Sequence, residues 1–302
     1  SGTVPALQNT GEIRNRGFEL AASWSDKIGE NWRYGVSANL TTIDNEVVSL
    51  ISKDYSIING VSRVSEGYPI GYFYGYKVAG VYQNETDIET SAPNQVASVK
   101  PGDLKFADVN GDGIISEKDR TMIGNPTPDF TYGLNINVGY KNWDLTAFFQ
   151  GTQGNDIFAL MKYDWYFGGA NSATLKDAFY NSWTPQNPNA EAPKLNSKNS
   201  SGINSLPSTF YVEDGSYFRC KNLQIGYSFN KKLLQKFHIE SFRIYAGVQN
   251  LFTITKYPLY DPEVSSNVLF DRGVDGFWQA QESPHEATMN SRVYNLGVNL
   301  TF

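Results

Sequence analysis

The chain has 302 residues and a formal net charge of −6, which argues against a nucleic-acid partner because such a partner requires a basic face. It contains 19 tyrosines, 18 phenylalanines and 6 tryptophans, and its single cysteine, Cys220, excludes an internal disulfide and is interpreted as a structural thiol. No run of about 18 apolar residues is present, so no transmembrane helix is predicted, whereas a membrane-spanning β-strand needs only about 9–11 residues.

Alternating apolar and polar residues begin close to the N-terminus, and this period predicts strands with one apolar and one polar face. The chain opens at Ser1-Gly2 with no signal peptide, so we expect it to be mature at that point or cut from something longer. Strands are predicted at residues 17–24 and 32–41. Residues 69–82 are aromatic-rich and less regular, and they are also expected to form a strand.

An acidic loop follows the polar connection 84–99, and its spacing is that of an EF-hand calcium loop. The expected oxygen ligands are Asp108, Asn110, Asp112, the backbone carbonyl of Ile114, and Asp119, which replaces the usual glutamate. No amphipathic helix flanks the loop, so a bound Ca²⁺ is expected to be structural and not part of a helix switch. The alternative is an ordinary turn rich in Asp, Asn and Gly that holds no ion.

The central part of the sequence predicts a β-hairpin. Residues 130–140 alternate over eleven positions, Lys141-Asn142 makes the turn, and the alternation resumes at residues 143–150. The apolar face of such a hairpin points into a core in a soluble sandwich and into lipid in an outer-membrane barrel. The two folds are distinguished by how often the pattern recurs.

The pattern does recur in the second half of the chain. Residues 155–167 are aromatic and could form a strand or a short helix, a short helix is predicted at 174–183, and a long loop covers 171–210; further strands are predicted at 216–229, 241–252 and 290–302. The parity breaks at Arg219, which indicates a bulge or a strand that has left the apolar layer. With about ten strands in all, the repetition favours an antiparallel membrane β-barrel over a sandwich.

Several motifs resemble those of the SusC/RagA group of TonB-dependent outer-membrane transporters. They are Gly102-Asp103, DVNGDG at 108–113, IGNP at 123–126, PDFTYG at 128–133, GYPIG at 67–71, WTPQNP at 183–188, DGSYFR at 214–219, QNLFT at 249–253 and the final Phe302. The resemblance implies the C-terminal portion of a barrel of about 22 strands. It also implies that the plug and the N-terminal strands are absent here, so the chain is a fragment or one piece of a split transporter completed by another chain.

The resemblance further implies import of an oligosaccharide or peptide nutrient across the outer membrane of a Bacteroidota-like cell. The implied partners are a SusD-like surface lipoprotein, TonB acting through the missing N-terminal part, and outer-membrane lipid. Aromatic loop residues that could stack on a substrate are Tyr163, Trp165, Tyr166, Phe167 and Trp278. The same rings could instead pack within loops or at a membrane interface.

Two other classes of function were compared with transport. A soluble, calcium-stabilised carbohydrate-binding β-sandwich explains the aromatic residues and the acidic loop, but not the alternation that continues to the last residue. An enzyme is not predicted, because the only histidines, His238 and His285, stand in unrelated contexts without a nucleophile elbow or zinc-ligand spacing.

Overall fold

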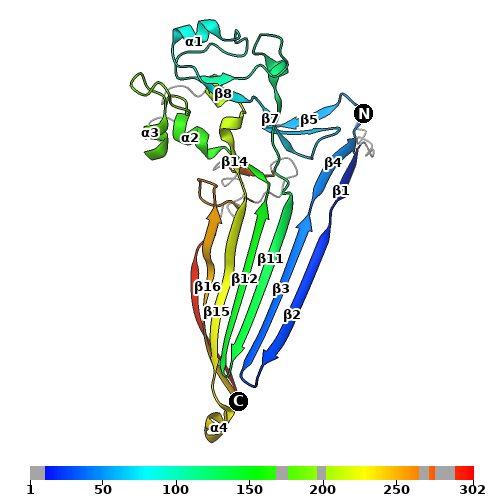
Figure 1. The fold of residues 1–302 in the computed structure, drawn as a ribbon, viewed down its shortest axis with the longest axis vertical. Coiled ribbons are helices and arrows are strands. Elements are labelled where there is room, and N and C mark those ends of the chain that lie inside the picture. Colours follow the sequence, from blue (N-terminus) through cyan, green and yellow to red (C-terminus); the bar gives the residue numbers. More distant parts are fainter. Residues whose placement is uncertain (1–10, 168–175, 196–201, 265–271, 276–289) are drawn as a thin grey trace, which may run out of the picture.

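The computed structural model describes residues 11–167, 176–195, 202–264, 272–275 and 290–302. Long antiparallel strands form one sheet, and the smaller elements gather at one end of it (Figure 1). We call this gathering of smaller elements the cap. It is formed by residues 43–129, 154–216 and 256–292, as far as the structure describes them.

The main sheet has seven strands in the order β18-β16-β15-β12-β11-β3-β2. Its strands are β2 (Glu19–Ile28), β3 (Trp32–Thr42), β11 (Phe130–Tyr140), β12 (Trp143–Gln153), β15 (Tyr217–Ser228), β16 (Ser241–Thr255) and β18 (Val293–Thr301). All seven strands were predicted from the alternating pattern. Strand β11 pairs without a register shift along its whole length, with β3 on one side and β12 on the other.

The two ends of this sheet differ in the length of their connections. At the end away from the cap, residues 29–31 and 141–142 make tight turns, and residues 229–240 carry α4 (Lys231–Leu234) and a 3₁₀ turn, η5 (Gln235–Phe237). At the other end, every connection is a long excursion into the cap (Figure 1). Strands of the main sheet therefore run the full distance between a short-turn end and a cap end.

The first excursion, residues 43–129 between β3 and β11, contains short strands that belong to three small sheets, together with α1. Its elements are β4 (Asp44–Ser49), which pairs with β1 (Glu12–Arg16); β5 (Ser56–Asn59), β6 (Ser62–Ser65), β7 (Tyr72–Gly75) and β10 (Thr121–Gly124) in one four-stranded sheet; β8 (Val78–Val81) with β9 (Leu104–Phe106); α1 (Glu85–Thr90); and the 3₁₀ turn η1 (Glu117–Asp119).

The single strand predicted at 69–82 is wrong, because the chain there divides into β7 and β8, which belong to different sheets. The division falls at Tyr76, whose N–H donates to the carbonyl of Pro207 at 2.9 Å. Pro207 comes from the second excursion, about 130 residues later in the chain by the difference in their numbers. A distant loop thus takes the hydrogen bond that a continuous strand would have used.

The second excursion, residues 154–216, and the third excursion, residues 256–292, complete the cap as far as the structure describes them. They contain β13 (Asp156–Ala159), α2 (Met161–Phe167), α3 (Lys176–Asn181), the 3₁₀ turns η3 (Ile203–Ser205) and η4 (Thr209–Tyr211), β14 (Val212–Asp214) and β17 (Val274–Asp275). The segment 155–167, for which strand and helix were both open, forms one of each. The short helix predicted at 174–183 is confirmed as α3.

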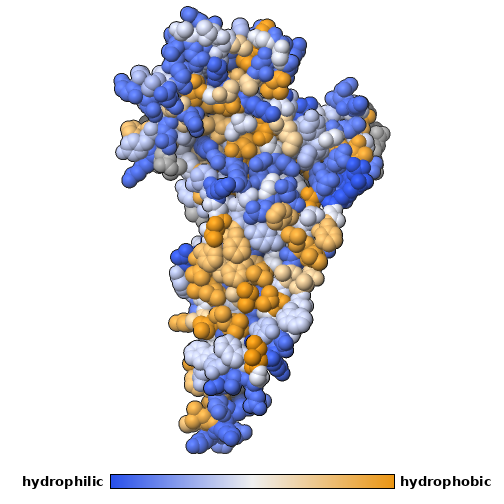
Figure 2. Space-filling view, in the orientation of Figure 1, coloured by the Kyte–Doolittle hydropathy of each residue, from blue (hydrophilic) through white to orange (hydrophobic). Residues whose placement is uncertain are grey.

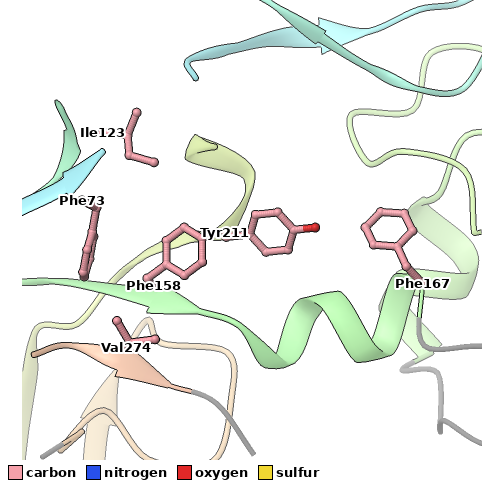
Figure 3. Packing of buried hydrophobic residues seen from close by; sticks show 6 residues of the cluster. All are labelled: Phe73, Ile123, Phe158, Phe167, Tyr211 and Val274. Carbon is pink, nitrogen blue, oxygen red and sulfur yellow. The ribbon is translucent and has the colours of Figure 1, made fainter. Parts of the chain in front are cut away.

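The hydrophobic core lies in the cap. Figure 3 shows one cluster, in which Phe73, Ile123, Phe158, Phe167, Tyr211 and Val274 meet from six different elements. A second cluster packs Tyr76 against Phe106, with parallel rings 4.5 Å apart, together with Leu104 and Ile115. The apolar face of the main sheet belongs to neither cluster, and no second sheet covers it among the described residues.

Candidate functional site: the two faces of the main sheet

One face of the main sheet is apolar and exposed. Leu296 is 86% exposed, Trp24 67% and Trp143 50%, although each lies in a regular strand. Figure 2 shows hydrophobic side chains gathered over the middle of the sheet, with hydrophilic surface above and below them. A continuous apolar area of this kind marks a surface that is covered by another apolar phase or partner.

Aromatic side chains border this apolar face toward the short-turn end. Trp32, Tyr140, Trp143 and Tyr227 are consecutive neighbours across β3, β11, β12 and β15. The rings of Trp32 and Tyr140 lie 4.4 Å apart, and those of Trp143 and Tyr227 lie 4.8 Å apart. These four residues form the turn-side aromatic row.

A second group of rings borders the apolar face toward the cap. It consists of Tyr132, Phe149, Phe218 and Phe252, and we call it the cap-side aromatic cluster. The rings of Tyr132 and Phe218 lie 6.2 Å apart and nearly parallel, on strands that flank β12. Gly151 of β12 pairs with both residues, and a Cβ there would lie 2.6 Å from the Tyr132 ring, so glycine is what permits the contact.

Between the two aromatic groups the apolar face is aliphatic. One row across the sheet consists of Val36, Ile136, Ala147, Leu223 and Val248, and the next row toward the turns includes Val138, Leu145, Ile225 and Ala246. The eight steps from Tyr132 to Tyr140 span about 27 Å along the strand at about 3.4 Å per residue. A strand tilt of about 40° would reduce this to a height of about 21 Å.

The opposite face of the sheet is polar, and glycines make space on it for long side chains. Nε of Arg243 on β16 donates to Oδ1 of Asp144 on β12 at 3.1 Å. The guanidinium crosses Gly226 of the intervening strand, where a Cβ would lie 2.3 Å from Nη2 of Arg243. Asn137, Thr146 and Gln224 occupy the next row on this face.

A β-bulge in β15 determines where Arg219 points. On the β12 side the pairing passes from Asn222–Phe148 to Cys220–Phe149, which leaves Lys221 as the extra residue. The register with β16 also shifts between Cys220 and Asn222. In a regular strand, Arg219 and Leu223 would lie on the same, apolar face because they are four residues apart. The bulge between them changes this, and Arg219 pairs with Gln150 on the polar face. Of the two explanations left open for the parity break at Arg219, the structure shows the bulge.

Beyond the bulge, Arg219 holds the start of the third excursion against the polar face. Its side chain is 2% exposed, and its Nη atoms donate to Asp261 at 2.6 Å and to Glu263 at 2.7 Å. Nε of Arg219 donates to the hydroxyl of Thr253 at 2.8 Å, and Nζ of Lys221 donates to Glu263 at 2.7 Å. Two cations and two carboxylates thus form a compact network, which we call the Arg219 network.

The carboxylate of Asp261 is ionised in this network. Burial alone would raise the pKa of this group, but the hydrogen bonds from Arg219 and from the backbone N–H of Glu263 outweigh it and hold the pKa below its ordinary value of 3.8. Sequence reasoning identified the irregularity at Arg219 but missed Asp261 and Glu263. Nothing in the spacing of these residues indicates a partner 42 positions away.

The acidic loop 108–119 is closed by its own hydrogen bonds. The carboxylate of Asp108 accepts the N–H groups of Gly111 and Gly113, both at 2.7 Å. Asp119 is fully buried and accepts the N–H groups of Val109 at 2.9 Å and Ser116 at 2.8 Å. Burial opposes ionisation of Asp119, but these backbone donors together lower its pKa. Among the described residues, no group of three or more acidic, His or Cys side chains is gathered closely enough to hold a metal.

The aromatic residues expected to contact substrate lie on α2, except Trp278, which is outside the described residues. Phe167 is 4% exposed within the core cluster of Figure 3, and Tyr163 and Tyr166 pack against the same cluster. Trp165 is half-buried and approaches Tyr260, with ring centroids 6.4 Å apart. The structure therefore gathers the four predicted residues on one helix but directs Phe167 inward.

The chain is similar to known proteins in both sequence and fold. No family model matches the chain. The chain is 33% identical, over its whole length, to TonB-dependent receptor P3 of Formosa agariphila, of which it covers 30%. It is 29% identical over 86% of its length to TonB-dependent receptor SusC of Bacteroides thetaiotaomicron, of which it covers 25%. In the structure of the RagAB peptide transporter, a chain matches 98% of this one with a TM-score of 0.74 and 24% identity, and 30% of that chain is covered.

These comparisons define the class of protein. The fold is mostly antiparallel β-sheet and matches a portion of a RagA-type receptor. The chain is a partial homologue of Bacteroidetes TonB-dependent receptors of the SusC/RagA type. It spans about 30% of the length of the relatives that it matches. In the part of the chain that the structure describes, no helix has the length and apolar character to cross a membrane.

Proposed function

We propose that this chain forms part of the lipid-facing wall and the extracellular loops of a TonB-dependent importer for an oligosaccharide or peptide nutrient. In this proposal the apolar face of the main sheet contacts outer-membrane lipid and the polar face lines the lumen. The cap then lies outside the cell, because barrels of this type have short periplasmic turns and longer extracellular loops.

The observation that carries the proposal is the apolar band of the main sheet between its two aromatic groups. Outer-membrane barrels have an apolar band about 25 Å tall with aromatic side chains at both interfaces. The band between the turn-side aromatic row and the cap-side aromatic cluster has a comparable height, about 21 Å after allowance for strand tilt. A core-facing sheet has no need of two such borders.

The edges of the sheet support a wall that continues beyond it. β2 and β18 each pair on one side only among the described residues, so each leaves a row of backbone groups without a strand partner. In lipid, every backbone N–H and C=O must be satisfied by protein. We propose that further wall strands, from the same or a separate chain that also supplies the plug, pair with both edges and close a barrel of about 22 strands.

The proposed substrate and partners follow from the relatives. RagAB is described as a peptide transporter, and SusC as a TonB-dependent receptor. We propose that the cap docks a SusD-like surface lipoprotein and that TonB acts through the N-terminal part of the receptor. Of the predicted aromatic residues, Trp165 with the exposed Tyr260 forms the pair most open to a substrate.

The test is extraction of the protein from its native membrane, followed by mass spectrometry of the intact complex. We expect the chain in the outer-membrane fraction, released only by detergent, together with plug-bearing sequence and a surface lipoprotein. Recovery in the aqueous fraction without detergent would contradict the lipid-facing role. A Trp165→Ala variant of the same receptor should bind substrate more weakly, whereas Tyr180→Ala, an exposed residue of α3, should not.

We further propose that the loop 108–119 binds Ca²⁺. The proposal is supported by the oxygen ligands in EF-hand register, namely Asp108, Asn110, Asp112, the Ile114 carbonyl and Asp119. The carboxylates of Asp108 and Asp119 already accept backbone N–H groups, but each carboxylate oxygen has a second lone pair. Bound Ca²⁺ would neutralise the acidic side chains and fix the loop against β10.

The measurement is thermal unfolding of the receptor with Ca²⁺ and after chelation by EGTA. We expect a higher unfolding temperature with Ca²⁺ in the natural protein and no difference in an Asp112→Ala variant, because this variant lacks one of the proposed ligands. The Asp112 side chain is exposed and accepts a hydrogen bond from Ile114 within the loop, so its removal should affect mainly the loop itself. Equal unfolding temperatures in the natural protein would show that the internal hydrogen bonds of the loop suffice without an ion.

A further inference from the structure

A cleft in the first excursion is lined by tyrosines and by cations. None of the α2 aromatic residues lines it, and it adjoins the C-terminal end of the acidic loop at Arg120. It has a volume of about 320 Å³ and is bordered by the four-stranded sheet of β5, β6, β7 and β10 and by the turn that contains Lys53. The residues that matter for its chemistry are Lys53, Arg63, Tyr68, Tyr72, Tyr74 and Arg120.

Two guanidinium groups converge on one ring in this cleft. Cζ of Arg63 lies 4.2 Å from the centre of the Tyr74 ring, and Cζ of Arg120 lies 4.6 Å from it. Arg63 is on β6 and Arg120 directly precedes β10, the strands that flank β7 on its two sides. The sheet therefore fixes both cations against the same aromatic side chain, in a geometry that favours guanidinium over ammonium.

Arg63 has no acidic partner in the part of the chain that the structure describes. No ion pair or side-chain hydrogen bond joins it to another described residue, and its buried Nε lacks an acceptor. Nε of Arg120 is likewise buried without an acceptor, although its Nη1 donates to the exposed Glu117 at 3.2 Å. The acidic residues that line the cleft, Asp54 and Glu66, form no ion pair with either arginine among the described residues. A fixed guanidinium without a counter-ion suits an oxyanion such as a carboxylate or a sulfate ester, which it can bind with two hydrogen bonds.

The tyrosines add flat apolar surface next to this charge. Tyr68 and Tyr72 stack with ring centroids 4.7 Å apart, and the outer ring, Tyr68, is 42% exposed. Tyr55 on the facing turn is also 42% exposed. Such rings offer both a face for stacking and a hydroxyl for hydrogen bonding. The cleft volume is near the lower end of the range for small-ligand sites, about 300–1,000 Å³, which is suitable for a single ring.

We propose that this cleft binds an acidic sugar residue, a uronate or sulfated unit of a glycan, with the carboxylate or sulfate on Arg63 and the sugar ring against Tyr68. The inference narrows the substrate class of the proposed importer and rests on that function for its biological meaning. An acidic peptide would supply the same charge without a pyranose ring, so the stacked tyrosines favour the saccharide.

The experiment is isothermal titration of the intact receptor in detergent with three probes. They are tetragalacturonic acid, the corresponding neutral galactose tetrasaccharide, and tetraglutamate. We expect tetragalacturonic acid to bind at least tenfold more tightly than the other two. Arg63→Gln should weaken its binding by about tenfold to a hundredfold, because a charge-assisted bidentate contact is lost. Lys77→Gln, which removes an exposed cation outside the cleft, is the matched control and should leave binding unchanged.

Equal affinity for the acidic and neutral saccharides would overturn the proposal, as would tetraglutamate binding as tight as that of tetragalacturonic acid. So would an Arg63→Gln variant that binds like Lys77→Gln. If Arg63→Gln fails to fold, Tyr68→Ala provides the second variant, because its exposed ring can be removed with little loss of packing. A separate measurement of nutrient uptake distinguishes failure of this inference from failure of the proposed function. Intact uptake without acidic-sugar binding would overturn only this inference. Acidic-sugar binding by a protein found outside the membrane would overturn the transport proposal.

Discussion

Nη2 of Arg219 donates to Oδ1 of Asp261 at 2.6 Å, across 42 residues of sequence that include most of the β15–β16 hairpin. The contact fixes the third excursion to the polar face just beyond the bulge in β15. Both side chains are largely buried, so substitutions in this pair can measure how much the contact between cap and sheet contributes to stability.

Removal of either charge should destabilise the receptor strongly. Replacing Asp261 with Asn, or Arg219 with Met, leaves a buried charge without its full complement, which typically costs about 3–5 kcal/mol. The control is Arg14→Gln, because the Arg14–Glu46 pair is exposed and should contribute about 0–1 kcal/mol. Urea unfolding of the detergent-solubilised receptor measures both effects. If Arg14→Gln destabilised the receptor as much as Asp261→Asn or Arg219→Met does, a central role for the Arg219 network would be contradicted.

The Arg219 network should also make stability depend on acid pH. The pKa of Asp261 is lower in the folded protein than its ordinary value of 3.8, so its contribution is complete above that value. The contribution is lost as the pH falls below 3.8 and through the folded pKa, because the unfolded state then binds the proton more readily. Asp261→Asn should therefore lose less unfolding free energy between pH 6 and pH 3 than the natural protein does. A parallel pH profile of the two proteins would show that Asp261 is not the responsible group.

Adjacent positions on β15 should respond oppositely to a lysine. Leu223 lies in the aliphatic row of the apolar face, whereas Gln224 lies on the polar face. Leu223→Lys should reduce insertion with a penalty of about 2–4 kcal/mol near the bilayer midplane, and Gln224→Lys should have an effect near zero. Reversed sensitivities would mean that the polar face contacts lipid. Quantitative folding into lipid vesicles gives both values.

The seven main strands were predictable because alternation of apolar and polar residues is a local property of the sequence. The division of residues 69–82 was not predictable, because it depends on the carbonyl of Pro207, which a local pattern cannot reveal. The same limit applies to Phe167, which was expected to face substrate but fills the core of the cap.

The period of each strand, the break in parity at Arg219 and the motifs shared with the SusC/RagA family can be read from the residues alone. The face that Arg219 occupies, the distant carboxylates that it contacts, and the tyrosine that Arg63 and Arg120 share depend on tertiary contacts. Strand pattern follows from neighbouring residues through backbone geometry, whereas ion pairs and clefts arise where packing brings together segments far apart in the chain.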